Sequence, residues 1–558
     1  MIDRQSMEKI WLKNYPPHVP LEINPDVYSS LAELFEESCS RFKALPAYSN
    51  LGVKLSYQQV DRDSYAFAAY LQQVMQLKKG DRIALMLPNV LHYPVALFGA
   101  LRAGLIVVNV NPLYTAPELI HQMNDSGAET LIVLTHFAKT VEEALPSTFL
   151  KNIIIADVGD YASFFKAWGI YLILKYIKKA IPKWHIPGAI RFKKVLAKGR
   201  TLSLRKVIID PEDTAFLQYT GGTTGIAKGA MLTHRNLIAN IQQATAWFNF
   251  EFGKEIFITA LPMYHIFSLM ANCLFCFHIG GLNILITNPR DIPGMVKEIK
   301  QFKFSVITGV NTLFNALLRH LPFSQVDFQA LKVALGGGAA VQRAVAEKWQ
   351  LVTGTPLREA YGLTETSPCV TINPTTLTTY NGTVGLPVSS TDVCILDNDG
   401  KEVPIGQAGE LAVKGPQVMR GYWQKPAETR TVFTPSGWLL TGDIASIDEA
   451  GFVRILERKK DMIIVSGFNV YPNEIEDTLM RIPGVTEAAV VGVKDEHSGE
   501  AVKAFIVKNK ADLSIQDVIE FCRHSLTAYK VPKYITFCQE LPKTNVGKIL
   551  RRQLRDNA

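Results

Sequence analysis

The 558-residue chain lacks any run of apolar residues long enough to cross a lipid bilayer, which takes ~18 or more in succession. Its first residues, MIDRQSMEKIWLKNYPPHVP, contain no uninterrupted apolar core behind a basic start. The amino terminus therefore does not look like a secretory signal. On these grounds we expect a cytoplasmic protein.

Cysteine is scarce as well. The seven cysteines are odd in number and scattered, which argues against a disulfide framework in a chain of this size. Cys273 and Cys276 form a CxxC pair within the apolar run ANCLFCFHIGG, without a second ligand pair at zinc-finger spacing. Buried, reduced thiols are the favoured interpretation of this pair.

Acidic residues are missing from one long segment. Residues 161–200 hold ten Lys or Arg and no Asp or Glu, with several aromatic residues between them. Such a segment can lie at an anionic membrane interface, which would place the protein peripherally at the inner face of the cell membrane. A packed helix pair with a solvated basic face explains the same pattern, and both interpretations stay open. Nucleic-acid binding is disfavoured because no recognised motif accompanies the charge.

The length predicts at least two domains, and the composition, 47% hydrophobic and 20% charged, is that of a globular protein. In DRIALMLPNVLHYPVALFGALRAGLIVVNVNP we predict a strand over 82–87, a helix ending near Gly104 and a strand over 105–110. This βαβ pattern recurs and is typical of a parallel sheet covered by helices. We therefore expect an α/β fold with a large N-terminal domain over residues 1–457.

From about Thr383 the sequence changes to short strands and Gly/Pro turns, as in GELAVKGPQVMRGYW. This texture predicts a small antiparallel β subdomain over about 383–457. The charged run ERKKDM suggests a hinge linker over 458–462. Residues 463–558 then form a small, mobile α+β domain, with EAAVVGV and AVKAFIVKN as strands and IQDVIEFCRHSL as a helix.

The segment YTGGTTGIAKGAML, residues 219–232, carries the strongest local signal. Its glycines allow sharp turns and close approach to a ligand, its threonines offer hydroxyls, and Lys228 offers a positive charge. These are the components of a phosphate-binding loop, although a Gly/Thr-rich surface loop would look similar. The order Ala227-Lys228-Gly229 differs from a Walker A motif, which disfavours the P-loop kinases and GTPases.

This segment resembles the phosphate-binding signature of the adenylate-forming enzymes, which include acyl-CoA synthetases, luciferases and peptide-synthetase adenylation domains. Further matches follow in the family's order: LPMYHIF at 261–267, GGGAA at 336–340, YGLTET at 361–366, TGD at 441–443, ERKKDMIIVSGFNVYPNEIE at 457–476 and PKTNVGKILRR at 542–552. INPDVYSSL, NVNPLYTAPEL, ITNPRDIPG and GVNTLFNALL resemble the bacterial long-chain fatty-acid ligases in particular.

The resemblance implies that a fatty acid, ATP and coenzyme A give acyl-CoA, AMP and pyrophosphate through an acyl-adenylate. It places the β- and γ-phosphates of ATP against the loop, Mg²⁺ on Glu365 and Thr220, and the α-phosphate near Thr364. The ATP- or AMP-binding set is Tyr219, Thr220, Gly221, Gly222, Thr223, Thr224, Gly225, Lys228, Gly337, Gly338, Ala339, Tyr361, Thr364, Asp443 and Arg458. Within it, Tyr361 faces adenine, while Asp443 and Arg458 reach the ribose.

By the same resemblance Lys548 is the catalytic lysine, because an ammonium there can bridge the acyl carboxylate and the α-phosphate. Lys460 corresponds to the hinge position, and Gly467 borders the coenzyme A channel. His265 corresponds to the gate beside the acyl carboxylate, and Val310 to Leu313 are expected in the wall of the acyl pocket.

The sequence departs from the family pattern at three places. Ala360 stands where glycine is expected, Ala339-Ala340 where Met-Pro is common, and Glu457 where Asp is usual. None of these changes removes a reacting group, but the first two border the nucleotide and carboxylate and could shift substrate choice.

Two other functions compete with this interpretation. The adenylate could pass to the phosphopantetheine of a carrier protein, although no carrier domain is fused here. Alternatively, the chain could be a membrane-bound fatty-acid-binding protein that lost catalysis, which the presence of Lys548, Glu365 and Asp443 disfavours. A homodimer is possible.

Overall fold

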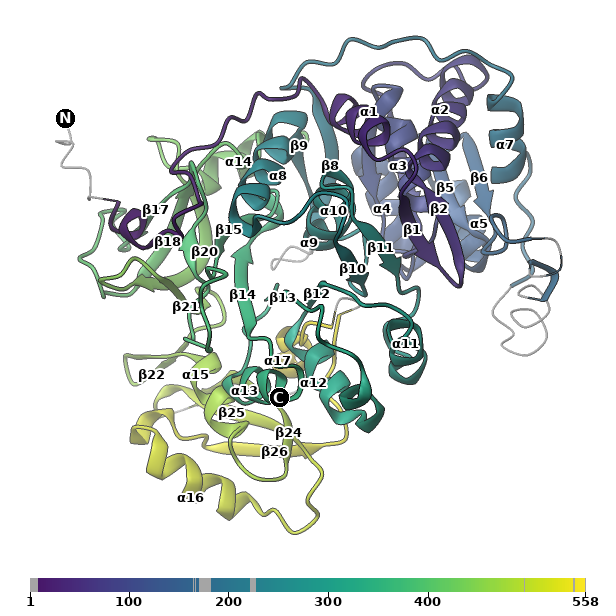
Figure 1. The fold of residues 1–558 in the computed structure, drawn as a ribbon. Coiled ribbons are helices and arrows are strands. Elements are labelled where there is room, and N and C mark those ends of the chain that lie inside the picture. Colours follow the sequence, from purple (N-terminus) through teal and green to yellow (C-terminus); the bar gives the residue numbers. More distant parts are fainter. Residues whose placement is uncertain are drawn as a thin grey trace.

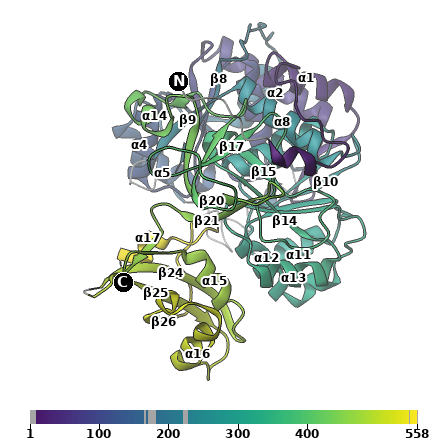
Figure 2. The same cartoon turned by 90° about the vertical axis from the view of Figure 1, so that its left-hand side faces the viewer.

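The computed structural model describes residues 9–163, 165, 167–169, 182–220, 227–495, 497–544 and 547–556. These residues form a large N-terminal lobe and a smaller C-terminal lobe below it (Figure 1). After rotation by 90° the C-terminal lobe, drawn in yellow-green, stands apart from the large lobe and joins it near β21 (Figure 2). The α/β fold expected from the sequence is confirmed.

Two large mixed sheets, covered by helices, build the large lobe. The first sheet has the strand order β16(Leu386–Pro387), β15(Cys369–Ile372), β14(Leu357–Gly362), β13(Val333–Gly337), β12(Val306–Gly309), β10(Ile256–Thr259), β11(Leu282–Leu285), β1(Pro46–Asn50) and β2(Val53–Ser56). The second has the order β19(Gly421–Tyr422), β9(Lys228–Thr233), β8(Thr214–Thr220), β4(Ile106–Asn109), β3(Arg82–Met86), β5(Thr130–Leu134), β6(Asn152–Ala156) and β7(Ile190–Arg191).

The predicted βαβ unit lies in the second sheet. Strands β3 and β4 pair in parallel with Leu85 opposite Asn109, and α3(His92–Arg102) connects them. Both strands are almost wholly buried, as a parallel sheet covered on both faces requires. The predicted boundaries thus agree with the structure to within a few residues.

Helices pack on these sheets around several hydrophobic clusters, one of which is much larger than the others. The rings of Phe35 in α1(Leu31–Arg41) and Phe98 in α3 stack at 4.1 Å, and Phe35 also stacks on Phe277 of α10(Cys276–His278) at 5.1 Å. The other helices of this lobe are α2(Tyr57–Gln73), α4(Ala116–Ser126), α5(Ala138–Ala144), α7(Phe192–Gly199), α8(His234–Phe248), α9(Ile266–Ser268), the π-helix η5(Leu269–Phe275), α11(Ile292–Ile299), α12(Asn311–Arg319), α13(Arg343–Thr353) and α14(Pro426–Val432).

A small antiparallel sheet occupies part of the predicted β subdomain, in the order β17(Asp392–Leu396), β18(Gly409–Lys414), β20(Leu439–Ile447) and β21(Val453–Arg458). Two segments that we assigned to this subdomain lie elsewhere. Gly421–Tyr422 pairs with β9, and Leu386–Pro387 pairs with β15. Both complete the edge of a larger sheet, whose backbone N–H and C=O groups need partners.

The C-terminal lobe contains a sheet of β23(Phe468–Val470), β22(Ile463–Val465), β25(Gly499–Lys508) and β24(Val485–Asp495), with β26(Tyr534–Cys538) pairing beside β25. Its helices are α15(Pro472–Leu479), α16(Ile515–Ser525) and α17(Arg551–Asp556). The segments predicted as strands and helix here take those forms. Residues 459–462 form the connection between β21 and β22.

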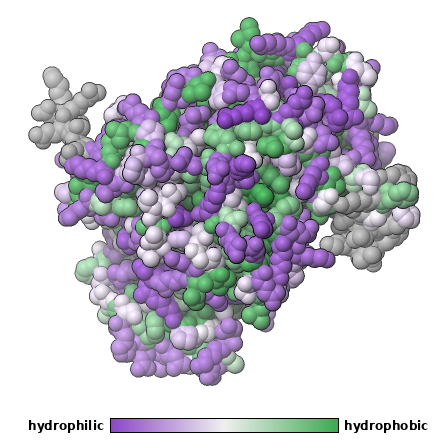
Figure 3. Space-filling view, in the orientation of Figure 1, coloured by the Kyte–Doolittle hydropathy of each residue, from purple (hydrophilic) through white to green (hydrophobic). Residues whose placement is uncertain are grey.

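Hydrophilic side chains cover most of the face drawn in Figure 3, with small hydrophobic groups between them. In the described part of the chain, no helix is both long and apolar enough to cross a membrane. The seven cysteines are free, and Cys273 and Cys276 are buried, as expected for reduced thiols.

The basic segment 161–200 is described only at its two ends. At its carboxyl end, α7 buries Phe192, Val195 and Leu196 and exposes its lysines, as a packed basic helix does. At its amino end, the side chains of Phe165 and Trp168 are 84% and 60% exposed. Residues 170–181 lie outside the described residues.

Candidate active site

A large cavity of about 2180 Å³ lies between the two lobes. Its walls come from the ends of β8, β9, β13 and β14, residues 441–443 of β20, the connection after β21 and the loop that carries Lys548. The carboxyl edge of parallel strands is where open α/β sheets bind their ligands. Most of the predicted site residues that the structure describes therefore line one cavity.

The predicted phosphate loop joins β8 to β9, and its two ends are ordered by strand pairing. Thr220 lies directly opposite Lys228 in the antiparallel pair. The Tyr219 hydroxyl donates a hydrogen bond of 2.6 Å to Asp125, and Lys425 pairs with the same carboxylate at 2.9 Å. Gly221, Gly222, Thr223, Thr224 and Gly225 lie outside the described residues.

The turn after β13 shapes the neighbouring wall. Gly338 has φ +77°, a left-handed conformation that favours glycine, and Ala339 beyond it is exposed. A Cβ atom at Gly337 would lie 3.1 Å from both the Ala360 carbonyl oxygen and the Phe267 ring. Glycine at 337 thus allows this turn to pack closely against Ala360 and Phe267, and glycine at 338 allows the backbone to turn.

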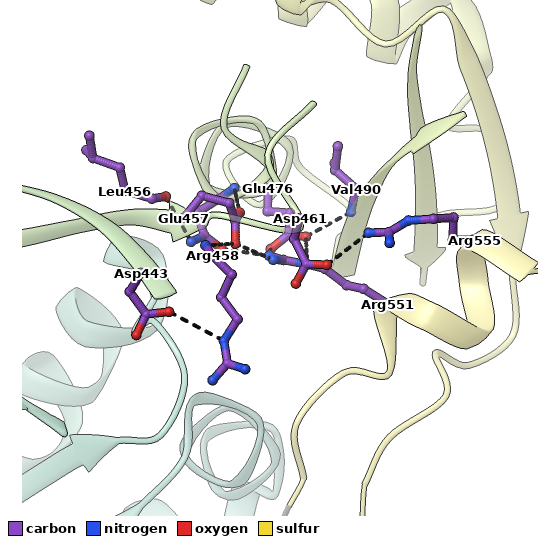
Figure 4. A network of polar contacts seen from close by, with 10 residues as sticks. Asp443, Leu456, Glu457, Arg458, Asp461, Glu476, Val490, Arg551 and Arg555 are labelled. Carbon is purple, nitrogen blue, oxygen red and sulfur yellow. Dashed lines mark hydrogen bonds and ion pairs between the residues drawn. The ribbon is translucent and has the colours of Figure 1, made fainter. Parts of the chain in front are cut away.

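Tyr361 and Asp443 are hydrogen-bonded to each other in the cavity lining, although they lie 82 positions apart in the sequence. The Tyr361 hydroxyl donates a hydrogen bond of 2.6 Å to one oxygen of Asp443. Arg458 Nε lies 3.6 Å from the other oxygen, a contact drawn in Figure 4. Asp443 is only 5% exposed, and burial raises the pKa of its carboxyl group while Arg458 partly offsets that rise. This geometry presents a paired-oxygen acceptor beside an aromatic ring.

Glu365 is held by a residue that the sequence analysis missed. The hydroxyl of Tyr422, in β19, donates a hydrogen bond of 2.7 Å to Glu365 Oε1. Lys228 Nζ lies 5.2 Å from the centre of the same ring. Tyr422 therefore links the predicted metal ligand to the predicted phosphate lysine, and Thr364 lines the cavity next to them.

Lys548 reaches this cavity from the C-terminal lobe. A Cβ atom at Gly338 would lie 3.1 Å from Lys548 Cε, and the Thr312 hydroxyl of the large lobe donates a 2.9 Å hydrogen bond to the Gly547 carbonyl. Burial, followed by the neighbouring Arg458, lowers the pKa of Lys548 to about 8, although Asp443 opposes this. Lys548 thus packs against the turn at 337–339. This turn, Tyr361 and Asp443 are predicted nucleotide-binding residues, and we call this part of the cavity lining the nucleoside wall.

His265 is the N-cap residue of α9, and its Nδ1 accepts a hydrogen bond of 3.4 Å from the backbone N–H of Phe267. Burial, with a smaller effect from Lys548, lowers the pKa of His265 to about 3. The ring is therefore neutral near pH 7 and would be a poor general base, which agrees with a positioning role.

An apolar arm of the cavity extends between α8 and the π-helix η5. Asn240, Ala244 and Phe248 recur at every fourth residue of α8 and so share one face. Across the arm lie Met270, Ala271 and Phe275 of η5, together with Cys369 and Ile372 of β15. Of the two residues expected in the acyl pocket wall, Val310 lines the cavity near Gly338 and Gly547, whereas Leu313 packs in the adjacent hydrophobic core.

The predicted hinge residue, Lys460, and the residue predicted to border the coenzyme A channel, Gly467, differ in their relation to the cavity. Lys460 lines it, in the connection between the lobes. Gly467, with φ +85°, forms the turn between β22 and β23 and is not part of the cavity wall.

Comparison with known proteins gives consistent matches over almost the whole chain. Residues 35–423 match the AMP-binding enzyme family, and residues 474–548 match the AMP-binding enzyme C-terminal domain. The long-chain-fatty-acid–CoA ligase of Escherichia coli O6:H1 is 55% identical over 554 residues, covering 99% of both chains. The ligase of the same name from Yersinia pestis is 55% identical over 552 residues, covering 99% of this chain and 98% of its own.

Solved structures share the fold. The anthranilate CoA ligase AuaEII, in complex with anthranoyl-AMP, superposes with a TM-score of 0.85 at 24% identity, covering 96% of this chain and 99% of its own. This structural likeness supports the two-lobed architecture.

Proposed function

Because the chain belongs to the AMP-binding enzyme family, we propose that it is a long-chain fatty acid–CoA ligase that works through an acyl-adenylate. In the first half-reaction a fatty carboxylate oxygen attacks the α-phosphorus of ATP, and the bond to the β-phosphate breaks to release pyrophosphate. In the second, the coenzyme A thiolate attacks the acyl carbonyl carbon, and AMP leaves.

One observation carries this proposal: Lys548 of the C-terminal lobe lies against Gly338 of the nucleoside wall, in a cavity that also has an apolar arm. Two anions must approach within bonding distance in the first half-reaction. An ammonium beside both offsets their repulsion and holds them in line. The full-length match to long-chain-fatty-acid–CoA ligases supports the same substrate class.

We assign the nucleotide to the nucleoside wall and to the neighbouring β8–β9 hairpin. Adenine stacks on Tyr361, and the Asp443 carboxylate accepts hydrogen bonds from the ribose hydroxyls. The β8–β9 hairpin, from Thr220 to Lys228, grips the β- and γ-phosphates. Thr364 donates to the α-phosphate.

Mg²⁺ fits the donor set around Glu365. Of the two Glu365 carboxylate oxygens, Oε1 has a hydrogen-bond partner among the described residues. Oε2 is left for a hard cation. No group of three or more His, Cys, Asp or Glu that could hold a metal occurs among the described residues, so phosphate oxygens would complete the coordination. When bound, the ion would neutralise charge on the phosphates.

The acyl chain is assigned to the arm between α8 and η5, with its carboxylate beside His265. The arm is lined by Ala244, Phe248, Met270 and Phe275, whose apolar surfaces suit a hydrocarbon chain. A cavity of about 2180 Å³ exceeds the roughly 300–1,000 Å³ typical of small-molecule sites, which leaves room for a nucleotide and a long chain together.

Thioester formation requires a second arrangement of the lobes. Lys548 occupies the cavity in this structure, while the Gly467 turn lies outside its wall. A rotation about Lys460 would withdraw the lysine and bring the β22–β23 turn to border the coenzyme A channel.

The decisive test measures the products across fatty acids of increasing chain length, with and without coenzyme A. We expect one AMP and one pyrophosphate per acyl-CoA, with turnover greatest for long chains and dependent on coenzyme A. Production of ADP, or turnover only with a phosphopantetheine carrier protein, would contradict the proposal.

The rate of adenylation should fall as pH rises above about 8. The ammonium form of Lys548 is the active one, and the free enzyme loses it as pH passes the lowered pKa of about 8. We expect kcat/KM for pyrophosphate exchange to drop about tenfold per pH unit beyond that point. Lys548→Arg should move the decline to higher pH, whereas a flat profile up to pH 9.5 in the unmodified enzyme would contradict the assignment.

Tyr422→Phe should weaken the dependence of ATP binding on Mg²⁺. The substitution keeps the ring beside Lys228 but removes the hydrogen bond that fixes Glu365. We expect the Mg²⁺ concentration for half-maximal adenylation to rise about tenfold, with a matching shift in calorimetric ATP binding. Tyr65→Phe, on α2 away from the cavity, is the matched control; equal effects of both changes would count against this role.

We also propose that the basic segment contacts anionic membranes through the exposed Phe165 and Trp168. Changing both to serine should reduce sedimentation with vesicles that contain phosphatidylglycerol and leave neutral vesicles unaffected. Phe149→Ser removes another ring that is 65% exposed and serves as the control. Unchanged sedimentation of the double variant would refute membrane binding through these residues.

A further inference from the structure

Three residues beyond Lys548, Arg551 makes a dense set of buried polar contacts (Figure 4). Its guanidinium group donates to Glu457 Oε1 at 2.7 Å, to Asn473 Oδ1 at 2.6 Å, and to both oxygens of Glu476 at 2.8 and 3.2 Å. The side chain is 17% exposed, and Glu457 is 1% exposed. Arg551 is therefore fixed by a two-sided fork, a geometry that a lysine cannot reproduce.

These partners belong to different lobes. Asn473 and Glu476 lie on α15 of the C-terminal lobe, so their bonds to Arg551 stay within that lobe. Glu457 belongs to β21 of the large lobe, one residue before the connection at 459–462. The Arg551–Glu457 pair consequently joins the two lobes and spans the connection.

The carboxylates of this cluster are themselves oriented by the backbone. Glu457 accepts from the N–H groups of Arg458 and Asn473, at 2.9 and 3.1 Å, and Glu476 accepts from the N–H of Val490 at 2.8 Å. Asn473 also donates to the Leu456 carbonyl at 3.1 Å. Asn473 thus contacts Glu457 and Leu456 from the C-terminal lobe, as Arg551 contacts Glu457, so these interlobe contacts form together in one orientation of that lobe.

A short stretch of backbone connects Arg551 to Lys548. Arg551 begins α17, and Leu550 before it donates its N–H to the Pro542 carbonyl at 2.8 Å, which closes the loop containing Lys548. On the other side of Lys548, the Thr312 hydroxyl of the large lobe donates a hydrogen bond to the Gly547 carbonyl. A displacement of Arg551 would therefore move Lys548 relative to the nucleoside wall.

We infer that Arg551 and Glu457 form an interlobe clamp that positions Lys548 for adenylation and is released when the C-terminal lobe rotates for thioester formation. Arg551 and Glu457 lie on opposite sides of the connection, so a rotation about Lys460 separates them. A second pair, Arg555 with Asp461 at 2.9 Å, attaches α17 to the connection itself. This inference rests on the proposed two-step reaction.

The test compares the two half-reactions in Glu457→Gln and Arg551→Lys. Adenylation is followed by pyrophosphate exchange, and thioester formation by supplying acyl-AMP and coenzyme A. We expect adenylation to fall about 10- to 100-fold, as a small misplacement of a reacting group does, while thioester formation stays within about twofold. Trypsin should also cut Glu457→Gln faster after Lys459 or Lys460, because the connection is less restrained.

Glu487→Gln is the matched control, since Glu487 lies on β24 of the same lobe, outside the cavity wall, and pairs with Lys543 of that lobe. It should leave the ratio of the half-reactions unchanged. Equal losses in both half-reactions of Glu457→Gln, or no loss in either, would overturn the clamp. Failure of the unmodified enzyme to make acyl-AMP from a fatty acid and ATP would instead overturn the proposed function.

Discussion

Replacing Lys548 by alanine should lower the rate of acyl-adenylate formation about a thousandfold. The ammonium group lies against Gly338, in a cavity whose other charged groups include Asp443 and Arg458. Without it, the fatty carboxylate and the α-phosphate would approach each other without a shared cation, in surroundings that screen charge poorly. Pyrophosphate exchange in the presence of fatty acid measures this step directly.

Thioester formation from supplied acyl-AMP should remain largely intact in Lys548→Ala, because the proposed rotation removes the lysine before coenzyme A reacts. Lys543→Ala is the matched control. Lys543 lies in the same loop, but its ammonium group pairs with Glu487 and lies outside the cavity wall. An equal loss of both half-reactions in Lys548→Ala would show that the lysine acts on folding or nucleotide binding alone.

Much of the fold could be predicted because its signals are local. The alternation of apolar runs around 82–110 sets β3, α3 and β4, and each of these elements is buried as its composition requires. The ordered motifs likewise identify the pieces of the site. Pairing partners are not local, so the sequence pattern did not indicate that Gly421–Tyr422 pairs with β9.

The contacts between motifs could not be predicted from the sequence. Tyr422 lies 57 positions from Glu365, and Arg551 lies 94 positions from Glu457. A tyrosine or arginine at such a position is typical of ordinary packing or of an exposed ion pair, and only the folded chain distinguishes these cases. Departures from the family pattern gave one partial signal, since Glu457 stands at such a position.

The acyl arm illustrates the same limit. Asn240, Ala244 and Phe248 recur with helical spacing, and such a stripe is ordinarily the buried face of a helix. Here that face is shared between the core and a cavity, because the π-helix η5 lies opposite and leaves space between the two elements. Periodicity predicts which face of a helix is covered but not whether protein or ligand covers it.

Ala244→Trp should convert the enzyme from long-chain to short-chain substrates. Ala244 is 9% exposed and lies midway along the α8 face of the arm, so an indole ring there would occupy the space assigned to the acyl chain. If the ring excludes about six methylene groups, the lost burial is about 5 kcal/mol, or a thousandfold or more in kcat/KM. We expect that loss for palmitate and a loss below about tenfold for hexanoate.

The effect must depend on chain length and not on general damage to α8. Ala246→Trp makes the same substitution two residues later, at a position that is half-buried and outside the cavity wall. It should reduce activity toward both acids equally, if at all. A uniform loss across chain lengths in Ala244→Trp would place the acyl chain elsewhere, whereas selective loss of palmitate would identify the surface between α8 and η5 as the determinant of substrate length.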